Sequence, residues 1–168
     1  FNALDASDQK VEHVIHCLSY GKQGSGTINS DVFWLAQTTG VESLIYLLQA
    51  LESSLDSRGT ISVSVVSNQV FKALESDIVD APKTSLQGFV KSIPAEFSSI
   101  QSRLIDLDHN DFETLIPILI EEIQSTRIED VAWRDYVRYV CRLNAIELLE
   151  SEKRSDPLET KGVYVVSG

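Results

Sequence analysis

The stretch SLQGFVKSIPAEFSSIQSRLIDLD, residues 85–108, decides the fold class of this chain. Its first half is typical of a helix, which we expect to end at Pro94 because proline lacks the backbone N–H that a helix interior needs. Residues 102–108, at the other end of the stretch, are typical of a strand. A helix that passes into a strand is one unit of the alternation that defines α/β proteins.

The segments upstream continue this alternation. Residues 11–20 (VEHVIHCLSY) are apolar and β-branched enough for a buried strand, and the glycines and serines of residues 21–30 predict a loop. Asp31 could cap the next segment, which is long and amphipathic with a weak break at Gly40. In residues 60–69 (TISVSVVSNQ), apolar residues alternate with serines, which is the period of a strand with one face covered.

The segments downstream add another helix and further strands. A helix is predicted after Asp111, with one side formed by Phe112, Leu115, Leu119 and Ile123. Pro117 falls inside that pattern, so we expect a kink or a late helix start. Residues 131–143 are rich in β-formers, and residues 163–166 (VYVV) should form the last strand. Strands and helices alternate throughout, so we predict an α/β sandwich with a mostly parallel sheet.

Composition narrows the class of protein. The chain has 168 residues, of which 43% are hydrophobic, enough for one compact domain. A net charge of -11 without a basic stripe disfavours nucleic acid and anionic membranes as partners. The longest apolar run, residues 114–120, is far below the roughly 20 residues that span a bilayer, and no signal peptide is recognisable. We expect a soluble, cytoplasmic protein, and the lack of methionine suggests a piece of a longer polypeptide.

Three residues of the first predicted strand are of types that bind metal ions, but their spacing excludes a shared metal site. His13, His16 and Cys17 are close in sequence, but the strand period sends His13 and Cys17 to one face and His16 to the other. They therefore cannot converge on one tetrahedral ion, and we interpret them as strand residues with partners in or near the core. Cys17 and Cys141 lie in apolar segments far apart, which predicts two buried, reduced thiols.

The loop after that strand resembles a phosphate loop only in part. Gly21, Gly24 and Gly26 follow a strand and precede a helix, where dinucleotide-binding folds place their glycines. The spacing is G-x-x-G-x-G, whereas the fingerprint is G-x-G-x-x-G, in which each glycine has a separate structural role. Lys22 follows the first glycine and not the last, so the P-loop pattern fails as well. An ordinary flexible loop is favoured over a phosphate cradle.

Residues 106–111 (DLDHND) partly match a calcium-binding loop. Asp106, Asp108 and Asn110 occupy its first, third and fifth positions. The sixth position should be glycine and is Asp111, and the twelfth should be glutamate and is Pro117. We interpret the segment as an acidic turn between a strand and a helix, with Asp111 as the helix cap.

No catalytic constellation is recognisable in the sequence. G-x-S-x-G, H-E-x-x-H and tyrosine followed four residues later by lysine or asparagine do not occur. Trp34 and Trp133 lie among apolar residues, which favours packing over ligand stacking. We therefore predict that this chain itself contains no catalytic, cofactor-binding or metal-binding residue.

Taken in order, the segments resemble the N-terminal structural subdomain of the ketoreductase of a modular polyketide synthase, from about residue 11 to the end. Besides the opening stretch, the resemblance rests on VIHCLSYG (14–21), SLIYLLQAL (43–51), ISVSVVSNQ (61–69), VAWRDYVRYVCRL (131–143) and KGVYVVSG (161–168). The most telling piece is KSIPAEF followed by RLIDLD, which is similar to that family's passage from helix to strand.

The resemblance implies a truncated Rossmann-like half of the short-chain dehydrogenase/reductase type, a three-layer sandwich without its own cofactor loop. Residues 1–150 would be the structural subdomain, 151–162 a charged linker, and 163–168 the first strand of the catalytic subdomain. NADPH and the catalytic serine and tyrosine would belong to that other subdomain, which reduces carrier-bound β-ketoacyl thioesters. Expected partners are that subdomain of the same polypeptide, neighbouring synthase domains and the acyl carrier protein, and this chain alone should bind no NADPH.

Two alternatives stay open. The chain could be a remnant scaffold half that supports a neighbouring synthase domain such as a methyltransferase. It could also be a free-standing small α/β enzyme or ligand-binding domain that uses the loop of residues 21–26.

Overall fold

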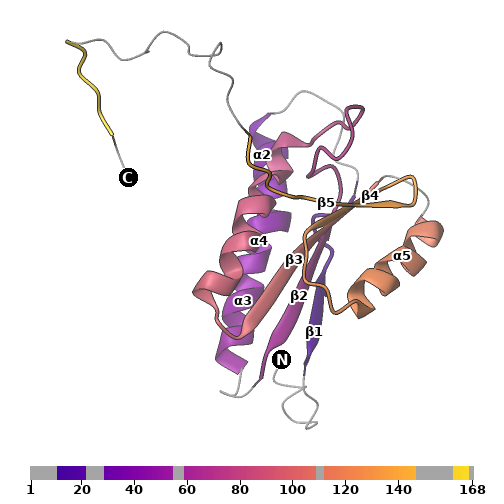
Figure 1. Ribbon diagram of the computed structural model, residues 1–168. Helices are drawn as coiled ribbons and strands as arrows, with labels where there is room; N and C mark the ends of the chain where they lie inside the picture. The colour runs from indigo at the N-terminus through magenta and orange to yellow at the C-terminus, as the bar shows by residue number, and fades with distance from the viewer. Residues whose placement is uncertain (1–10, 22–28, 55–58, 109–111, 147–160, 167–168) are drawn as a thin grey trace.

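The computed structural model describes residues 11–21, 29–54, 59–108, 112–146 and 161–166 (Figure 1). Helices and strands alternate along them as the sequence predicts. The elements are β1 (His13–His16), α2 (Ser30–Gln37), the π-helical segment η1 (Thr38–Glu42), α3 (Ser43–Ser54), β2 (Ile61–Ser67), the 3-10 segment η2 (Ala81–Lys83), α4 (Ser85–Glu96), β3 (Ile100–Leu107), α5 (Phe112–Gln124), β4 (Val131–Arg134) and β5 (Val137–Val140).

The strands form one five-stranded sheet in the order β1-β2-β3-β4-β5. The first four strands are parallel and β5 pairs antiparallel with β4, so the predicted mostly parallel α/β sheet is confirmed. Residues 131–143, rich in β-formers, supply the hairpin of β4 and β5. Its two turn residues, Asp135 and Tyr136, both have positive φ (48° and 63°), as in the tight turns whose twist matches that of the flanking strands.

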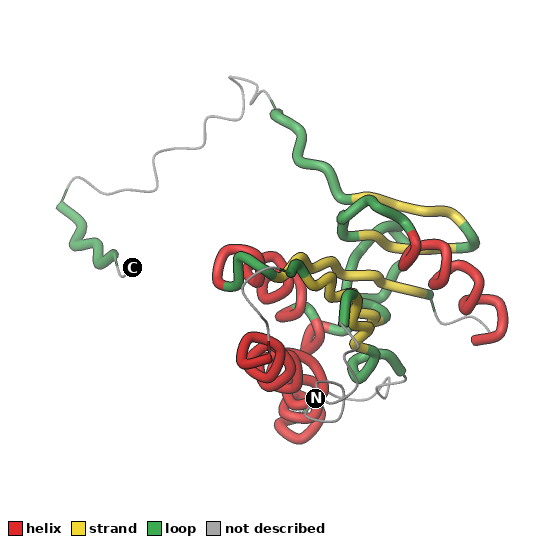
Figure 2. Tube along the Cα trace, turned by 90° about the horizontal axis from the view of Figure 1, so that it is seen from below, coloured by secondary structure: helices red, strands yellow, loops and turns green. Residues whose placement is uncertain are grey.

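Helices cover both faces of the sheet, which makes three layers (Figure 2). Successive strand residues point to opposite faces. Val65 and Leu104 belong to the larger core cluster, which α3 and α4 cover. Their neighbours Val66 and Ile105 belong to a smaller cluster with Leu115 of α5. We call the two sides of the sheet the α3/α4 face and the α5 face.

The serine side of β2 differs from the prediction. The alternation predicts one covered face, yet Ser64 and Ser67 have no exposed surface. On the α5 face of β2, Ser64 is tolerated because its Oγ accepts a hydrogen bond from Arg103 Nε at 2.9 Å. Ser67 points to the α3/α4 face, like Val65, and its Oγ donates to the Ser19 carbonyl at 3.2 Å.

The long helical segment after residue 29 begins at a different cap from the one predicted and is interrupted where the prediction placed its break. Asn29, and not Asp31, is the N-cap, since its side chain accepts a hydrogen bond from the Val32 N–H at 2.9 Å. The weak break predicted at Gly40 is the π-helical segment η1. Gly40 is buried there, and a Cβ on it would lie 3.4 Å from Leu86 Cδ2 of α4. The small residue therefore allows α4 to approach this bend closely.

Helix α4 does not end at Pro94 as predicted but continues to Glu96. Pro94 has no N–H to donate to the Val90 carbonyl, four residues earlier. Ser102 of β3 replaces it, because its Oγ donates to that carbonyl at 2.7 Å. A side chain from the next strand thus compensates for the proline.

Two further expectations are corrected by the structure. Helix α5 begins at Phe112, before Pro117, so a late helix start is wrong. Trp34 of α2 is 64% exposed and lies edge-to-face with Phe33, whereas Trp133 packs on the α5-face cluster as predicted.

Residues 163–166 form no β-ladder with the described strands, and Val163, Val165 and Val166 are at least 90% exposed. That they are the first strand of another subdomain stays a prediction. None of the described helices is both long and apolar enough to cross a bilayer.

Candidate functional site

Polar side chains gather where β2 ends, at the edge of the sheet where α/β proteins commonly bind ligands. Lys83 is 2% exposed, and its Nζ donates to Asn68 Oδ1 at 2.6 Å and to the Gly21 carbonyl at 3.1 Å. Burial lowers the pKa of Lys83. The Gly21 N–H also donates to Asn68 Oδ1, at 3.2 Å. Both peptide groups of Gly21 are therefore occupied by internal hydrogen bonds.

Gly21 is the residue of the predicted glycine loop that belongs to the described part of the chain. Lys22, Gly24 and Gly26 lie outside the described residues. Gly21 itself has a φ of 144°, in the region that favours glycine. In the described part of the chain, the hydrogen bonds of Gly21 to Asn68 and Lys83 hold the segment after β1 in place.

A second polar cluster at the same edge is centred on Arg134 of β4. Arg134 Nη2 lies 3.0 Å from Asp106 Oδ2, and Nε lies 3.0 Å from Asp77 Oδ2. Asp106 Oδ2 also accepts the N–H groups of Val70 and Phe71 at 3.0 and 2.7 Å. Burial raises the pKa of Asp106, which is fully buried. Burial opposes the charge of Arg134, but the two carboxylates outweigh it and raise the pKa of Arg134.

This cluster also shows what the predicted acidic turn does. Asp106 holds the backbone after β2, and Asp108 Oδ2 accepts the Asp135 N–H at 2.9 Å. Both carboxylates therefore hold neighbouring segments together. Asn110 and Asp111, including the predicted helix cap, lie outside the described residues.

His13 and His16 lie on opposite faces of the sheet, as the strand period predicts. His13 Nε2 is 2.9 Å from Ser64 Oγ on the α5 face, and His16 Nε2 is 2.8 Å from Ser43 Oγ of α3. Cys17 follows β1, which is shorter than predicted. Cys17 and Cys141 are free thiols, but both are exposed, so the prediction of buried thiols is wrong because both lie beyond the ends of their strands.

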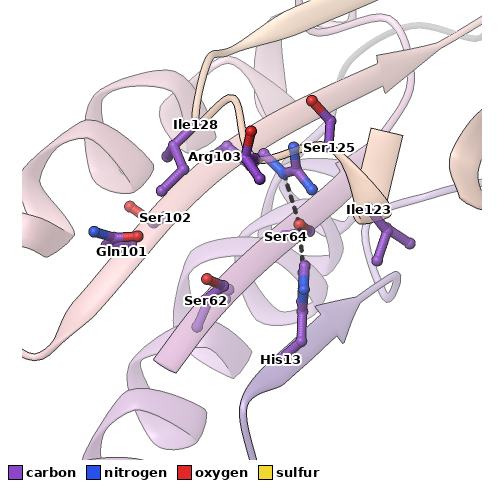
Figure 3. A pocket seen from close by; sticks show the side chains of 11 residues that line it. His13, Ser62, Ser64, Gln101, Ser102, Arg103, Ile123, Ser125 and Ile128 are labelled. Atoms are coloured by element: carbon purple, nitrogen blue, oxygen red, sulfur yellow. Dashed lines mark hydrogen bonds between the residues drawn. The ribbon is translucent and has the colours of Figure 1, made fainter. Parts of the chain in front are cut away.

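A pocket of about 270 Å³ opens on the α5 face (Figure 3). Its floor is formed by side chains of β1, β2 and β3, and one wall by the end of α5 and the loop after it. The lining residues whose roles are argued below are His13, Ser62, Ser64, Arg103, Ile123 and Ile128.

Arg103 organises the pocket. It is 4% exposed, its Nε donates to Ser64 Oγ at 2.9 Å, and its Nη1 donates to the Arg127 carbonyl at 3.0 Å. Ser64 Oγ, which accepts from Arg103, also lies 2.9 Å from His13 Nε2, and the His13 tautomer decides which of these two atoms donates. Burial and then the positive charge of Arg103 lower the pKa of His13, so the ring is neutral near pH 7.

Behind Arg103 lies a chain of ion pairs that the sequence did not reveal. Glu122 of α5 is 3% exposed, and its Oε2 lies 3.9 Å from Arg103 Nη1. Glu122 also pairs with Arg138 of β5, which in turn contacts Glu129 at 3.3 Å. Arg142 pairs with Glu129 at 2.6 Å. The sequence contains one sign of these ion pairs. Arg103 and Glu122 are charged residues at inward-facing positions of an otherwise apolar strand and an otherwise apolar helix.

Part of the α5 face remains uncovered. Ile15 of β1 points to the same face as His13 and is 46% exposed. On α5, Ile116 and Ile120 are 43% and 49% exposed, and their spacing places them on the same side as Ile123, which lines the pocket. Large apolar side chains at these positions indicate a surface that another structure can cover.

Comparisons with known proteins find similarity to short segments of much longer proteins. A scan against protein families matches none of them. Over 92 residues the chain is 32% identical to the phthioceranic/hydroxyphthioceranic acid synthase of Mycobacterium tuberculosis and of Mycobacterium bovis. That alignment includes 54% of this chain and 4% of the synthase, so the chain corresponds to a small part of the relative's length.

A solved structure shares the fold. It is the adenylation, ketoreductase and pseudo Asub multidomain structure of a keto acid-selecting NRPS module. The TM-score is 0.69 with 22% sequence identity, over 83% of this chain and 12% of that one. The Rossmann-like α/β fold of this chain therefore occurs within a multidomain assembly.

Proposed function

We propose that this chain is the noncatalytic structural subdomain of a ketoreductase in a cytoplasmic polyketide synthase. Its role is to stabilise a catalytic subdomain of the same polypeptide, which reduces carrier-bound β-ketoacyl thioesters with NADPH. Neighbouring synthase domains and the acyl carrier protein are its further partners. The chain itself contributes no group to the chemistry and binds no cofactor.

Two kinds of similarity support this proposal. The sequence match is to a segment of a long synthase, and the shared fold comes from a multidomain structure that includes a ketoreductase. The polar clusters at the carboxyl edge of the sheet support it as well, because Lys83 and Arg134 bind the chain's own backbone and carboxylates.

The observation that carries the proposal is the half-covered α5 face. Ile15, Ile116 and Ile120 remain between 43% and 49% exposed on the face where α5 is the covering helix. Each Å² of apolar surface removed from water stabilises a complex by about 25 cal/mol. A subdomain packed on this face would therefore gain stability without any catalytic group from this chain.

The proposal is tested in the parent polypeptide. We expect deletion of residues 1–150 to abolish NADPH-dependent reduction of a β-ketoacyl thioester, because the remaining half loses its support. Adding the separately expressed chain should restore part of the activity. The chain alone should show no micromolar NADPH affinity in a calorimetric titration.

Two results would contradict the proposal. One is full reductase activity and unchanged thermal stability of the polypeptide that lacks residues 1–150. The other is saturable NADPH binding by the chain alone, which would favour a free-standing ligand-binding domain.

A further inference from the structure

We infer that the pocket on the α5 face is a binding site for the carboxylate of a short-chain monocarboxylic acid. The inference rests on the groups that line the pocket, and it goes beyond the scaffold role proposed above. It concerns Arg103 and His13 on the sheet and the isoleucines Ile123 and Ile128, which also line the pocket.

The polar side of the pocket offers hydrogen-bond donors. The Nε and Nη1 of Arg103 are used by Ser64 and Arg127, and within the described part of the chain no partner is recorded for its Nη2. In the His13 tautomer that the proposal requires, Ser64 Oγ donates to Nε2 and the Nδ1 proton is a further donor; the hydroxyl of Ser62 adds another. A guanidinium nitrogen and neighbouring neutral donors together are suited to a carboxylate oxygen.

The charge of the pocket favours a monoanion. Arg103 supplies one positive charge, and Glu122 at 3.9 Å already compensates part of it. His13 contributes hydrogen bonds but no charge near neutral pH, since its ring is neutral. A phosphate dianion would bring more negative charge than the pocket can balance in a partly desolvated place. A carboxylate brings a single charge that matches one guanidinium.

Two isoleucines add apolar surface to the pocket. Ile123 from the end of α5 lies on the side of His13, and Ile128 from the following loop lies beside Arg103 (Figure 3). The same loop also contributes Ser125 and Thr126. A pocket of about 270 Å³ has room for a chain of a few carbons beside the carboxylate. The alkyl part of a short fatty acid would lie against these isoleucines and lose contact with water.

The test is an NMR titration of the chain with butyrate, butyramide and inorganic phosphate at constant ionic strength. We expect butyrate to shift the His13 ring signals with at least about tenfold tighter binding than butyramide, because the amide lacks the charge. Phosphate should also bind about tenfold more weakly than butyrate. Equal binding of either probe would overturn the inference.

Variants separate the pocket from the general charge of the surface. Arg103→Lys, which keeps the charge but loses the fork of donors, should weaken butyrate binding about tenfold. Arg127→Gln is the matched control, because it removes an exposed charge next to the pocket and keeps the carbonyl that Arg103 contacts; its affinity should be unchanged. Since Arg103 is buried and its variant could fail to fold, His13→Phe is measured as well by calorimetry. Unchanged affinity in His13→Phe would overturn the inference.

Discussion

Arg134 is the residue on which the carboxyl edge of the sheet depends. Its guanidinium contacts two carboxylates and also donates to the Phe71 carbonyl at 3.0 Å. The side chain of its partner Asp106 has no exposed surface. Removal of Arg134 would leave Asp106 buried without its counterion, which is far more costly than the loss of a surface pair.

We therefore predict that Arg134→Met lowers the free energy of unfolding by about 3 kcal/mol in urea denaturation. The control is Lys72→Met, which removes the exposed pair of Lys72 and Glu75. That variant should change stability by less than about 0.5 kcal/mol. Equal losses of unfolding free energy in the two variants would show that the buried ion pair contributes no more to stability than the exposed one.

His16 makes the stability of the chain depend on pH. Its Nε2 bonds to Ser43 Oγ, which itself donates to backbone carbonyls of η1, so His16 Nε2 is the donor and Nδ1 is unprotonated. Among the described residues, Nδ1 is buried and has no hydrogen-bond partner, so a proton placed there would be poorly solvated. Burial accordingly lowers the pKa of His16.

The direction of the pH dependence follows from linkage. Because the folded pKa lies below the unfolded value of about 6.5, the unfolded chain binds more protons as the pH falls through this value. Stability should be constant above about pH 7.5 and decrease between about pH 6.5 and the lowered pKa of the folded state. His16→Gln should show a smaller difference between urea unfolding at pH 7.5 and pH 5.5. An identical difference in both proteins would exclude His16 as a cause.

At the scale of elements, Ser102 of β3 allows α4 to continue past Pro94, because it donates to the carbonyl that the proline leaves without a donor. Val90 is 1% exposed, so its carbonyl has no ready access to water if Ser102 is lost. Ser102→Ala should cost about 1 to 2 kcal/mol in urea denaturation. In a Pro94→Ala background the cost should fall by half or more, because residue 94 then supplies its own N–H to Val90.

The control for this double-mutant cycle is Ser92→Ala. Ser92 Oγ also donates to a carbonyl of α4, that of Phe89, but on the exposed side of the helix. Its replacement should stay within about 0.5 kcal/mol. Additive effects of Ser102→Ala and Pro94→Ala would contradict the compensation between the two residues.

The existence and order of the elements could be predicted from the sequence, but several boundaries could not. Periodicity identifies β2 and α5 because their apolar residues recur at fixed spacing. The end of α4 depends on Ser102, which the proline rule applied to residue 94 cannot take into account. The cap at Asn29 was missed because Asp31 is an equally good cap by residue type, and only the path of the backbone distinguishes them.

At the scale of the whole molecule, the α5 face should distinguish this chain alone from the chain in its parent polypeptide. Ile120→Glu and Ile78→Glu both replace an exposed isoleucine, the first on α5 and the second in the loop after Asp77. In the chain alone both should change stability by less than about 0.5 kcal/mol. In the parent polypeptide only Ile120→Glu should lower the midpoint of thermal unfolding, by a few degrees for a loss of about 1 kcal/mol. Equal midpoints would mean that nothing packs on α5.

The sequence predicts which face of the sheet each histidine of β1 occupies, but not the residues that surround it. The strand period placed His13 and His16 on opposite faces, and the structure agrees. The partners of His13 and Arg103 could not be predicted, because Ser64, which contacts both, comes from β2 and Glu122, which pairs with Arg103, comes from α5. A charged residue in an apolar segment marks such a site, but its counterion is known only once the segments are placed in space.

The π-helical segment η1 makes this region tolerant of a change in length at one place. Each residue of a regular α-helix advances the side chains by about 100° around the axis. The i→i+5 bonding of a π-turn holds one more residue than an α-turn, so η1 takes up one residue without rotating the helix that follows. Removing one residue between Thr38 and Glu42 would therefore make the helix regular and leave Leu44 and Leu48 facing the core. Homologous sequences should tolerate a one-residue deletion in η1 far better than one within α3.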